Sequence, residues 1–321
     1  MRRTGLAFLL LLALLGLPLG VAPWFGWGAS LGQPQPFIVE NGASLGKVTR
    51  ALEHQHIIHS AGQFRVLARV LGSDAPVQAG RYRLAAGMAW RDILSALQQG
   101  RTERQAVTIP EGWPAVLVAE RLNGLPGLAG TIAPPREGSI LPDTYAYESG
   151  EPRAAVLGRM QAAMARALAE EWPKRSARAV VKSPAEAVIL ASIVEKETGK
   201  ASERRTIAGV YSNRLRTGMK LDADPTVIYP ITRGKPLGRR IRQSELRRDT
   251  GYNTYLKPGL PAGPIANPGR ASLRAVLDPA ATDALYFVAD GSGGHVFAAT
   301  LAEQNRNVQR WFAIRRQRGE M

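Results

Sequence analysis

The sequence predicts an α+β protein with an apolar N-terminal segment, a small α+β module and a larger α+β domain. Three observations lead to this fold class. Residues 5–22 form an uncharged, leucine-rich run. Short extended runs alternate with amphipathic helical patterns over residues 37–123, and an alanine-rich amphipathic helix is predicted at residues 154–171, within residues 124–321. Because 45% of the 321 residues are hydrophobic, the chain can bury one substantial core or two smaller ones.

Residues 1–27 are expected to form a cytoplasmic N-terminus and a transmembrane anchor. The apolar run is long enough to cross, or nearly cross, a hydrocarbon core of roughly 30 Å. Arg2 and Arg3 precede it, and no basic residue lies between it and Glu40, which places the rest of the chain outside the cytoplasm. A cleaved signal peptide is the alternative, although Pro23 makes a poor cleavage site. The anchor predicts a single-pass bacterial inner-membrane protein with membrane lipid as one partner and its folded part in the periplasm.

The composition excludes several chemistries. The chain has no cysteine, so it has no disulfide, no thiolate nucleophile and no cysteine-ligated metal. The formal net charge of +16 would suit nucleic acid, and arginines are densest in residues 231–248. Outside the cytoplasm, however, lipid headgroups and wall polymers are the available polyanions. We therefore expect weak surface attraction or simply solvated basic faces, with no nucleic-acid partner, no metal and no cofactor.

A spacer with several glycines and prolines, residues 28–36, leads into a predicted small module at residues 37–123. Within this module one arrangement occurs three times: a short extended run, two residues, a glycine and an amphipathic helix. The three glycines are Gly42, Gly87 and Gly112. By shape the module resembles the LysM-type modules that bind N-acetyl sugars, and sugar binding and pure scaffolding are the two alternatives for it.

Residues 124–321 are predicted to form the larger domain. Its first part, residues 124–150, is rich in glycine and proline and joins the module to the domain. This stretch carries Asp143 and Tyr145, which are candidates to close a ligand cleft from the linker side.

The helix that begins at Ser183 has the most informative sequence. Ser183 at the N-cap, Pro184 at the first position and Glu186 at the third form a capping box. The apolar residues that follow cover nearly every direction around the axis, so the helix should be buried on most sides. Glu195, near its end, falls on the stripe that faces the core.

Glu195 has two interpretations on these residues alone. Burial disfavours an ionised carboxyl and raises its pKa, which suits a general acid that must hold a proton at neutral pH. The alternative is a structural ion pair with Arg204 or Arg205. Spacing places no second carboxylate beside it, whereas ordinary retaining and inverting glycosidases use two.

The string ILASIVEKET at residues 189–198 resembles the signature of the YceG-like endolytic murein transglycosylases. Further strings match that family in order, at residues 213–215, 219–221, 224–229, 252–255, 259–261, 265–269, 286–291 and 294–295. The resemblance covers essentially the whole chain. It departs between Pro230 and Arg248, where the arginine-rich stretch puts local contacts in doubt but not the reaction.

The resemblance implies that Glu195 is the catalytic acid and base of a lytic transglycosylase. Such an enzyme cuts the β-1,4 bond between MurNAc and GlcNAc within nascent peptidoglycan glycan strands. The MurNAc C6 hydroxyl closes onto C1 to leave a 1,6-anhydro end, and this internal nucleophile explains why one carboxyl suffices. The resemblance further implies a role in glycan chain termination beside glycan-polymerising penicillin-binding proteins.

Aromatic and amide side chains in the matching loops are candidates to hold sugar rings. They are Asp224, Thr226, Tyr229, Tyr252, Asn253, Tyr255 and Asn267. The alternative is that these side chains only fix the packing of the domain. His295 is expected to open the return strand of a hairpin and not to bind a metal.

Two other functions are compatible with the sequence. A non-catalytic, membrane-anchored peptidoglycan-binding scaffold would be indifferent to a change at Glu195. A hydrolytic muramidase would leave a reducing end where the transglycosylase leaves an anhydro end.

Overall fold

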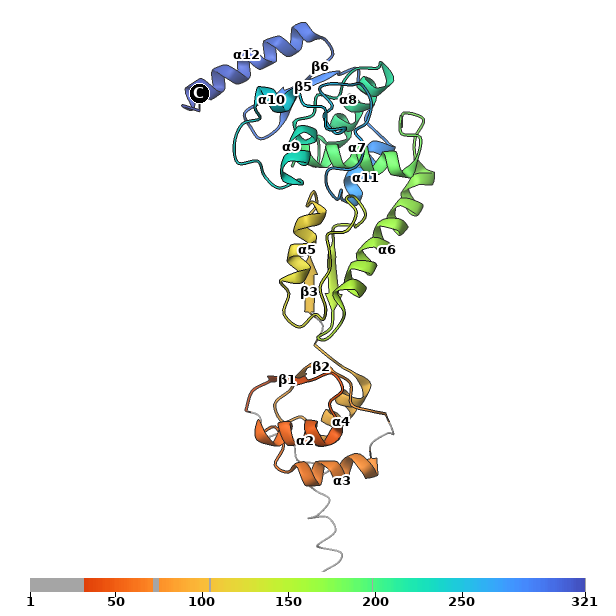
Figure 1. The fold of residues 1–321 in the computed structure, drawn as a ribbon, viewed down its shortest axis with the longest axis vertical. Coiled ribbons are helices and arrows are strands. Elements are labelled where there is room, and N and C mark those ends of the chain that lie inside the picture. The colour runs from red at the N-terminus through yellow and green to blue at the C-terminus, as the bar shows by residue number, and fades with distance from the viewer. Residues whose placement is uncertain (1–31, 72–74, 104, 198, 321) are drawn as a thin grey trace, which may run out of the picture. The chain divides into compact units, whose positions relative to one another are not determined.

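The structure is a computed structural model that describes residues 32–71, 75–103, 105–197 and 199–320 as two compact units (Figure 1). Unit 1 holds the described residues up to Ala106 together with residues 126–129 and 146–152, and the remaining residues form unit 2. The anchor expected within residues 1–27 lies outside the described residues. Among the residues that are described, no helix has the length and apolarity needed to cross a membrane.

Unit 1 combines a two-stranded antiparallel sheet with helices. Its elements are β1 (Gln35–Val39), α2 (Leu45–His54), α3 (Ala61–Leu71), β2 (Gly80–Leu84) and α4 (Trp90–Gln99). In the sheet, Phe37 lies opposite Tyr82. Alternate strand residues pack with the apolar helix faces into one core, which includes Phe37, Val39, Leu52, Phe64, Leu67, Tyr82, Leu84, Trp90, Ile93 and Leu97.

The predicted strand, glycine and helix arrangement is present three times. β1 leads through Gly42 into α2, β2 leads through Gly87 into α4, and β3 (Gln105–Thr108) leads through Gly112 into α5 (Ala115–Asn123). All three glycines have φ between 67° and 74°, the left-handed region that favours glycine. Each helix begins three residues after its glycine. The helix α3 was not predicted.

The third of these arrangements lies in unit 2, although the sequence analysis placed residues 107–123 in the first module. Two contacts explain its place. The backbone N–H of Ile109 donates a 2.9 Å hydrogen bond to the carbonyl of Asp143, and β3 pairs with β4 (Thr144–Tyr147). Contacts distant in sequence therefore decide where the first unit ends.

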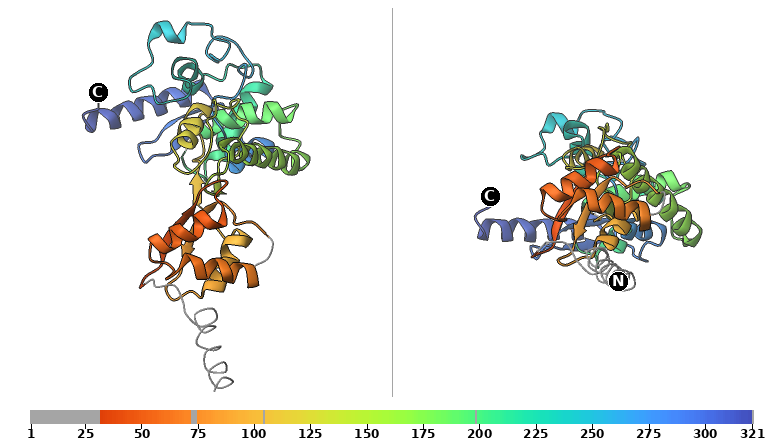
Figure 2. Two further views of the ribbon diagram at one scale, coloured as in Figure 1. Left: turned by 60° about the horizontal axis from the view of Figure 1, so that its bottom comes forward. Right: turned by 90° about the horizontal axis from the view of Figure 1, so that it is seen from below.

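Unit 2 holds most of the helices. Its further elements are α6 (Arg153–Glu171), η1 (Trp172–Lys174), α7 (Pro184–Glu197), α8 (Arg204–Arg216), α9 (Asp224–Thr232), α10 (Gln243–Leu246), α11 (Arg270–Leu277), β5 (Tyr286–Ala289), β6 (His295–Ala298) and α12 (Leu301–Gln317). β5 and β6 form the predicted hairpin, and His295 is the first residue of its return strand. The Asp290 N–H donates a 2.9 Å hydrogen bond to the Gly294 carbonyl and closes the turn between the strands. The helix α12 lies against this hairpin and projects from it (Figure 2).

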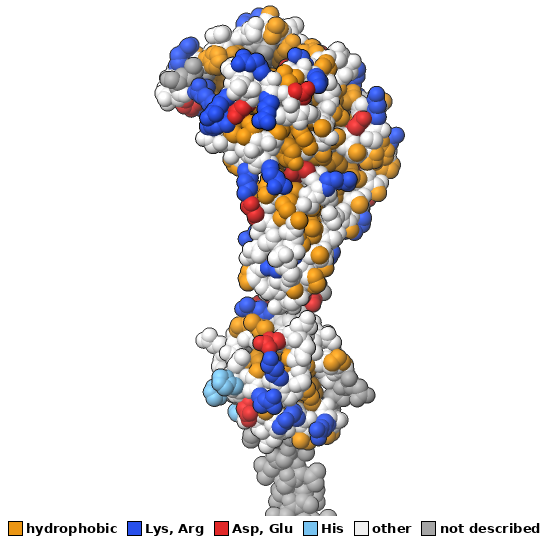
Figure 3. All heavy atoms as spheres, viewed as in Figure 1, with side chains coloured by type: hydrophobic (Ala, Val, Ile, Leu, Met, Phe, Trp, Pro, Cys, Tyr) orange, Lys and Arg blue, Asp and Glu red, His pale blue; other side chains and the backbone are white. Residues whose placement is uncertain are grey.

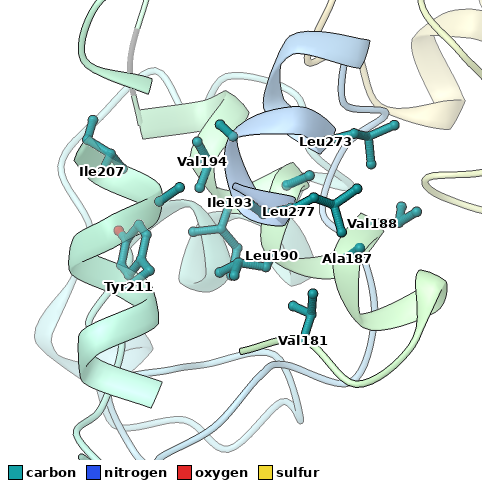
Figure 4. Close-up of a cluster of buried hydrophobic side chains, with 14 of the residues drawn as sticks. Val181, Ala187, Val188, Leu190, Ile193, Val194, Ile207, Tyr211, Leu273 and Leu277 are labelled. Atoms are coloured by element: carbon teal, nitrogen blue, oxygen red, sulfur yellow. The ribbon is translucent and has the colours of Figure 1, made fainter. Parts of the chain in front are cut away.

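The helix α7 is the centre of the unit 2 core. Its Leu190, Ile193 and Val194 lie between side chains of α8 and side chains of α11 (Figure 4). At its start, the Ser183 hydroxyl accepts from the N–H of Glu186 at 3.2 Å, as predicted. The reciprocal half of the capping box differs, because the Glu186 carboxylate accepts from the N–H of Lys182.

The mixed content of helices and two-stranded sheets confirms the α+β prediction. Lys and Arg side chains are spread over much of the face of unit 2 drawn in Figure 3, in line with the net charge of +16.

Candidate active site

Glu195 lies in the last turn of α7, and its side chain is only 5% exposed. Its Oε1 lies 3.4 Å from Nη2 of Arg204, at the start of α8. Its Oε2 accepts a 2.8 Å hydrogen bond from the backbone N–H of Gly269, the N-cap of α11. These two contacts, one to a guanidinium and one to a helix N-terminus, fix the position of the Glu195 carboxyl group.

Burial and ion pairing of Glu195, which are alternatives on the sequence alone, therefore occur together. Of the two arginines considered as partners, Arg204 makes the contact. Arg205 instead binds Asp278 at 2.6 Å.

A second carboxylate, which the sequence analysis did not single out, shares the same guanidinium. Oε2 of Glu111 lies 3.7 Å from Nη2 of Arg204, and the Glu111 side chain is 47% exposed. Burial and the negative charge of Glu195 raise the pKa of Glu111, and the charge of Arg204 opposes them. Glu111 is thus the more accessible carboxyl of the two. The only sequence signal for it was its place in the turn before Gly112.

Two glycines make room for this pair of carboxylates. A Cβ at Gly269 would overlap the carboxyl group of Glu111. A Cβ at Gly112 would lie 3.4 Å from Cγ of Glu195, in addition to being strained by a φ of 73°. The carboxylates approach each other because neither backbone segment carries a side chain at this point.

Asn267 connects the loop before Gly269 to the turn at Gly112. Its carbonyl accepts from the N–H of Gly112 at 3.0 Å, and its own N–H and Nδ2 both donate to the carbonyl of Trp113. Its Oδ1 accepts from the N–H of Ile140 at 3.2 Å. Asn267 is a predicted substrate contact, but the residue is fully buried. It holds the backbone before Gly269 in place instead of facing a ligand.

Glu137 completes this buried network. Its Oε1 accepts from Nδ2 of Asn267 at 3.1 Å and from the N–H of Ala115, at the start of α5, at 2.9 Å. Burial raises the pKa of Glu137 to about 7, although the Ala115 N–H and the Tyr229 hydroxyl act in the opposite direction. A carboxyl that ionises near neutral pH therefore supports the segment that holds Glu195.

Comparisons with known proteins agree with this geometry. The model of the YceG-like family matches residues 37–310. The chain belongs to the YceG-like family. A Bacillus subtilis (strain 168) protein named endolytic murein transglycosylase is 27% identical over 312 residues, which cover 87% of this chain and 85% of the relative.

A second relative of the same name, from Streptococcus pneumoniae serotype 2 (strain D39), is 26% identical over 319 residues. That match covers 84% of this chain but only 57% of the longer relative. The crystal structure of a YceG-like protein from Listeria monocytogenes superposes with a TM-score of 0.53 at 26% identity, covering 85% of this chain and 99% of that one.

Two of the predicted sugar-holding residues of this YceG-like chain pack against each other. The rings of Tyr229 and Tyr252 have centroids 5.0 Å apart and are tilted by 45°. Both residues are partly exposed, and the Tyr229 hydroxyl bonds to the carboxyl of Glu137. The pair is thus connected, through Glu137 and Asn267, to the segment that positions Glu195.

Asp224 and Tyr255 form a second group. The Tyr255 hydroxyl donates a 2.6 Å hydrogen bond to Oδ1 of Asp224, at the start of α9. Burial and this carboxylate raise the pKa of Tyr255. Asp224 is exposed and Tyr255 is partly exposed, so both residues can contact a ligand.

Thr226 and Asn253 support the fold. Thr226 is fully buried and its hydroxyl accepts from the N–H of Thr254 at 3.2 Å. Asn253 is 7% exposed, and its Nδ2 donates to the carbonyls of Leu246 and Arg248 at 2.9 Å and 3.0 Å. For these two residues the structure favours the packing role that the sequence analysis gave as the alternative.

The side chains of Asp143 and Tyr145 bond to the backbone of their own segment. Oδ1 of Asp143 accepts from the N–H of Thr144 at 2.7 Å, and the Tyr145 hydroxyl donates to the carbonyl of Leu141 at 2.6 Å. Asp143 is exposed and Tyr145 is partly buried.

His295 bonds through Nδ1 to Oε2 of Glu203 at 2.8 Å, which fits its place at the start of β6. Within the described part of the chain, no three His, Asp or Glu side chains gather as metal ligands would.

Proposed function

We propose that this chain is an endolytic peptidoglycan lytic transglycosylase, an enzyme that cuts glycan strands internally. The observation that carries the proposal is Glu195, a nearly buried carboxyl held by Arg204 and the N–H of Gly269, with the more exposed Glu111 at the same guanidinium. The relatives from Bacillus subtilis and Streptococcus pneumoniae bear the name of this activity.

In the proposed reaction the Glu111 and Glu195 pair supplies one proton and recovers one. The proton goes to the oxygen that links C1 of MurNAc to GlcNAc while the C1–O bond breaks. The C6 hydroxyl of the same MurNAc then bonds to C1 and returns its proton to the Glu195 carboxylate. One C–O bond replaces another and no water is consumed, so the new end is 1,6-anhydro-MurNAc.

The arrangement of charges suits this chemistry. The two carboxylates share one guanidinium, and burial together with the charge of Glu195 raises the pKa of Glu111, which suits a group that must donate a proton. A negative carboxylate in a nearly dry position stabilises the positive charge that develops on the sugar ring. The attacking hydroxyl belongs to the substrate, so proximity replaces a bound water or a protein nucleophile.

The proposal assigns sugar contacts to the accessible predicted residues. Tyr229 and Tyr252 offer partly exposed ring faces, and Asp224 and Tyr255 offer a carboxylate and a hydroxyl. Asp143 and Tyr145 are assigned to the edge of the cleft, as the sequence suggests. Unit 1 is proposed to act as a LysM-like module that binds N-acetyl sugars of the same strand.

We also propose that the enzyme acts at the inner membrane. The apolar run at residues 5–22 would anchor the chain in the inner membrane, with both units in the periplasm. An internal cutter next to the membrane would release strands while they are made, which gives it a role in chain termination beside glycan-polymerising penicillin-binding proteins.

A hydrolytic muramidase is the second candidate function, and Glu111 is the observation that favours it. Most glycosidases place two carboxyl groups beside the scissile bond. One acts as the acid, and the other activates a water molecule or attacks the sugar. The two reactions differ in the end that they leave.

The test uses the full-length chain and its Glu195→Gln variant with long, uncrosslinked glycan strands, and reads the products by mass spectrometry. We expect internal fragments with 1,6-anhydro ends from the wild type and none from the variant. Glu120→Gln is the control, because Glu120 is an exposed, ion-paired carboxylate outside the site. Reducing ends would favour the muramidase, and intact strands with the wild type would favour a non-catalytic scaffold.

A further inference from the structure

A hollow of about 780 Å³ opens beside the carboxyl pair, with Glu111 and Arg204 in its wall. This volume is within the range of roughly 300–1,000 Å³ that is usual for ligand sites. Its lining residues come mainly from α6, η1, α8 and α11, together with Glu111 in the turn before α5.

The lining has more positive than negative charge. Five side chains are cationic, namely Lys174, Arg204, Arg205, Arg270 and Arg274, and three are anionic, namely Glu111, Glu171 and Asp278. A concave surface with an excess of one sign concentrates ligands of the other sign. The hollow is therefore suited to an anionic group.

Glu171 organises these cations. Its side chain is 4% exposed and bonds to Arg274 Nη2 at 2.7 Å, Arg270 Nη1 at 3.0 Å and Lys174 Nζ at 3.3 Å. The hydrogen bond from Arg274 leads the contacts that lower the pKa of Glu171 to about 2, against the effect of burial. Glu171 thus holds three cations in place, and Arg270 also pairs with Glu170 at 2.6 Å, so the three cations and two carboxylates keep one net positive charge.

Arg204 also has unused capacity. Its side chain is 13% exposed, and its buried Nε has no hydrogen-bond partner, while Nη2 serves both Glu111 and Glu195. A guanidinium binds a carboxylate best through two parallel N–H groups. Arg204 thus contacts the proposed catalytic carboxyl of Glu195 and also lines the basic hollow.

We propose that this hollow binds the carboxylates of the peptide stem on the MurNAc residue that is cut. This inference rests on the proposed function. The sugars of the strand are neutral N-acetyl hexoses, and the lactyl group of MurNAc carries a peptide with free carboxylates. Since the hollow adjoins the carboxyl pair, a stem on the reacting MurNAc lies within reach of it. The enzyme should therefore prefer strands that still carry their peptides.

Binding is measured first, with the full-length Glu195→Gln protein so that no cleavage interferes. The two probes are the GlcNAc-MurNAc disaccharide with its stem peptide and the same disaccharide with its lactyl carboxyl group capped as a methylamide, so that the second probe carries no charge. We expect at least about tenfold tighter binding of the peptide-bearing probe, the order of one charge-assisted hydrogen bond. The advantage should shrink when salt is raised. Equal binding of the two probes would overturn the proposal.

Arg274→Gln and Lys174→Gln are each added separately to the Glu195→Gln protein, to test whether the tighter binding of the peptide-bearing probe comes from the hollow. Each removes one exposed cation and leaves Glu171 with two partners, and thermal unfolding checks that each variant is folded. We expect each to reduce the peptide advantage by about tenfold. Lys257→Gln is the matched control, because Lys257 is 74% exposed, is also paired with a carboxylate, and lies outside the hollow. An unchanged advantage in both hollow variants would also overturn the assignment.

Cleavage by the wild type separates the two proposals. If strands with and without peptides are both left intact while the binding advantage is present, the proposed reaction fails and the anion site stands. If both strands are cut at equal rates and bind equally, the reaction stands and the stem site fails. Inorganic pyrophosphate is added as a competitor, and stronger binding of it than of the peptide-bearing probe would reassign the hollow to a phosphate group.

Discussion

Glu111 and Glu195 differ mainly in access, since the first side chain is 47% exposed and the second 5%. An exposed carboxyl exchanges protons with solvent and substrate, whereas Glu195 is held in a defined position by Arg204 and Gly269. The charge of Glu195 and burial raise the pKa of Glu111, and the charge of Arg204 opposes them. The proton chemistry at this site therefore belongs to the pair and not to Glu195 alone.

We expect Glu111→Gln to lower kcat by about 10²–10⁴-fold, because it removes a proton-carrying group but keeps the shape and the contact surface. The measurement is the initial rate of strand cleavage, with Glu120→Gln as the control at similar exposure. A variant that cuts at the wild-type rate would remove Glu111 from the mechanism and leave Glu195 to act alone.

Glu137 makes stability depend on pH. Its pKa rises from the ordinary 4.5 to about 7 in the folded chain, so the folded state binds its proton more tightly than the unfolded state. This contribution to stability is complete below pH 4.5 and is lost as pH rises through 7. The free energy of unfolding should fall over this interval by on the order of 2–3 kcal/mol from this group.

Glu137→Gln should remove that part of the pH dependence, because the amide oxygen still accepts from Ala115 and Asn267 and carries no charge. The measurement is urea unfolding of both proteins at pH 5 and pH 8. Burial also raises the pKa of Glu197 to about 7, so only the difference between wild type and variant isolates Glu137. A difference that does not change with pH would contradict the assignment.

At the scale of elements, the start of α11 and the turn before α5 bring the carboxyl pair together. Gly269 offers its N–H to Glu195 and no side chain to Glu111. Asn267 fastens the same loop to the turn at Gly112. The site is thus made by two turns that pack against the end of α7.

We expect Gly269→Ala to reduce cleavage about as much as Glu111→Gln, with less than about 1 kcal/mol lost in stability. The backbone there is extended, with φ of −73°, so alanine fits and the N–H to Glu195 is kept. The new Cβ displaces the mobile end of Glu111 instead of the backbone. Rates and urea unfolding are compared with Gly158→Ala, a helical position where a Cβ meets nothing within 4 Å.

The double variant with Glu111→Gln and Gly269→Ala sharpens this test. If both changes act through Glu111, the second should add little to the first. Effects that multiply in full would mean that Gly269→Ala disturbs Glu195 directly.

At the scale of the whole molecule, the division into two units does not follow the sequence pattern. The glycine turn and helix after β3 look like the two earlier copies, yet they belong to unit 2 because residues 130–145 bond to them. The turn that carries Glu111 is for this reason part of the same unit as Glu195. A boundary drawn from local similarity alone separated these two residues.

Removal of residues 1–27 should move the protein from the membrane fraction to the soluble fraction of cells, because the deletion removes the apolar run that we propose as the anchor. Cell fractionation followed by immunoblotting is the measurement, with the full-length chain as the control. A truncated protein that stays in the membrane fraction would contradict an anchor confined to this segment.

Several features of this protein follow from local sequence. The start of α7 at Ser183 and Pro184, the three glycine turns and the hairpin before His295 were predictable because each depends on residues a few positions apart. Glu195 was found because it interrupts an apolar helix and belongs to a recognisable string. These signals determined the fold class, the family and the main candidate residue.

Tertiary structure decided the rest. Glu111 lies beside Glu195, Asn267 is buried and the basic hollow exists only because segments far apart in the sequence pack together. An asparagine in a loop has the same sequence pattern whether it meets a sugar or a backbone carbonyl. Long-range packing and burial decide which partner the asparagine contacts. Periodicity and spacing along the chain contain no information about that packing or burial.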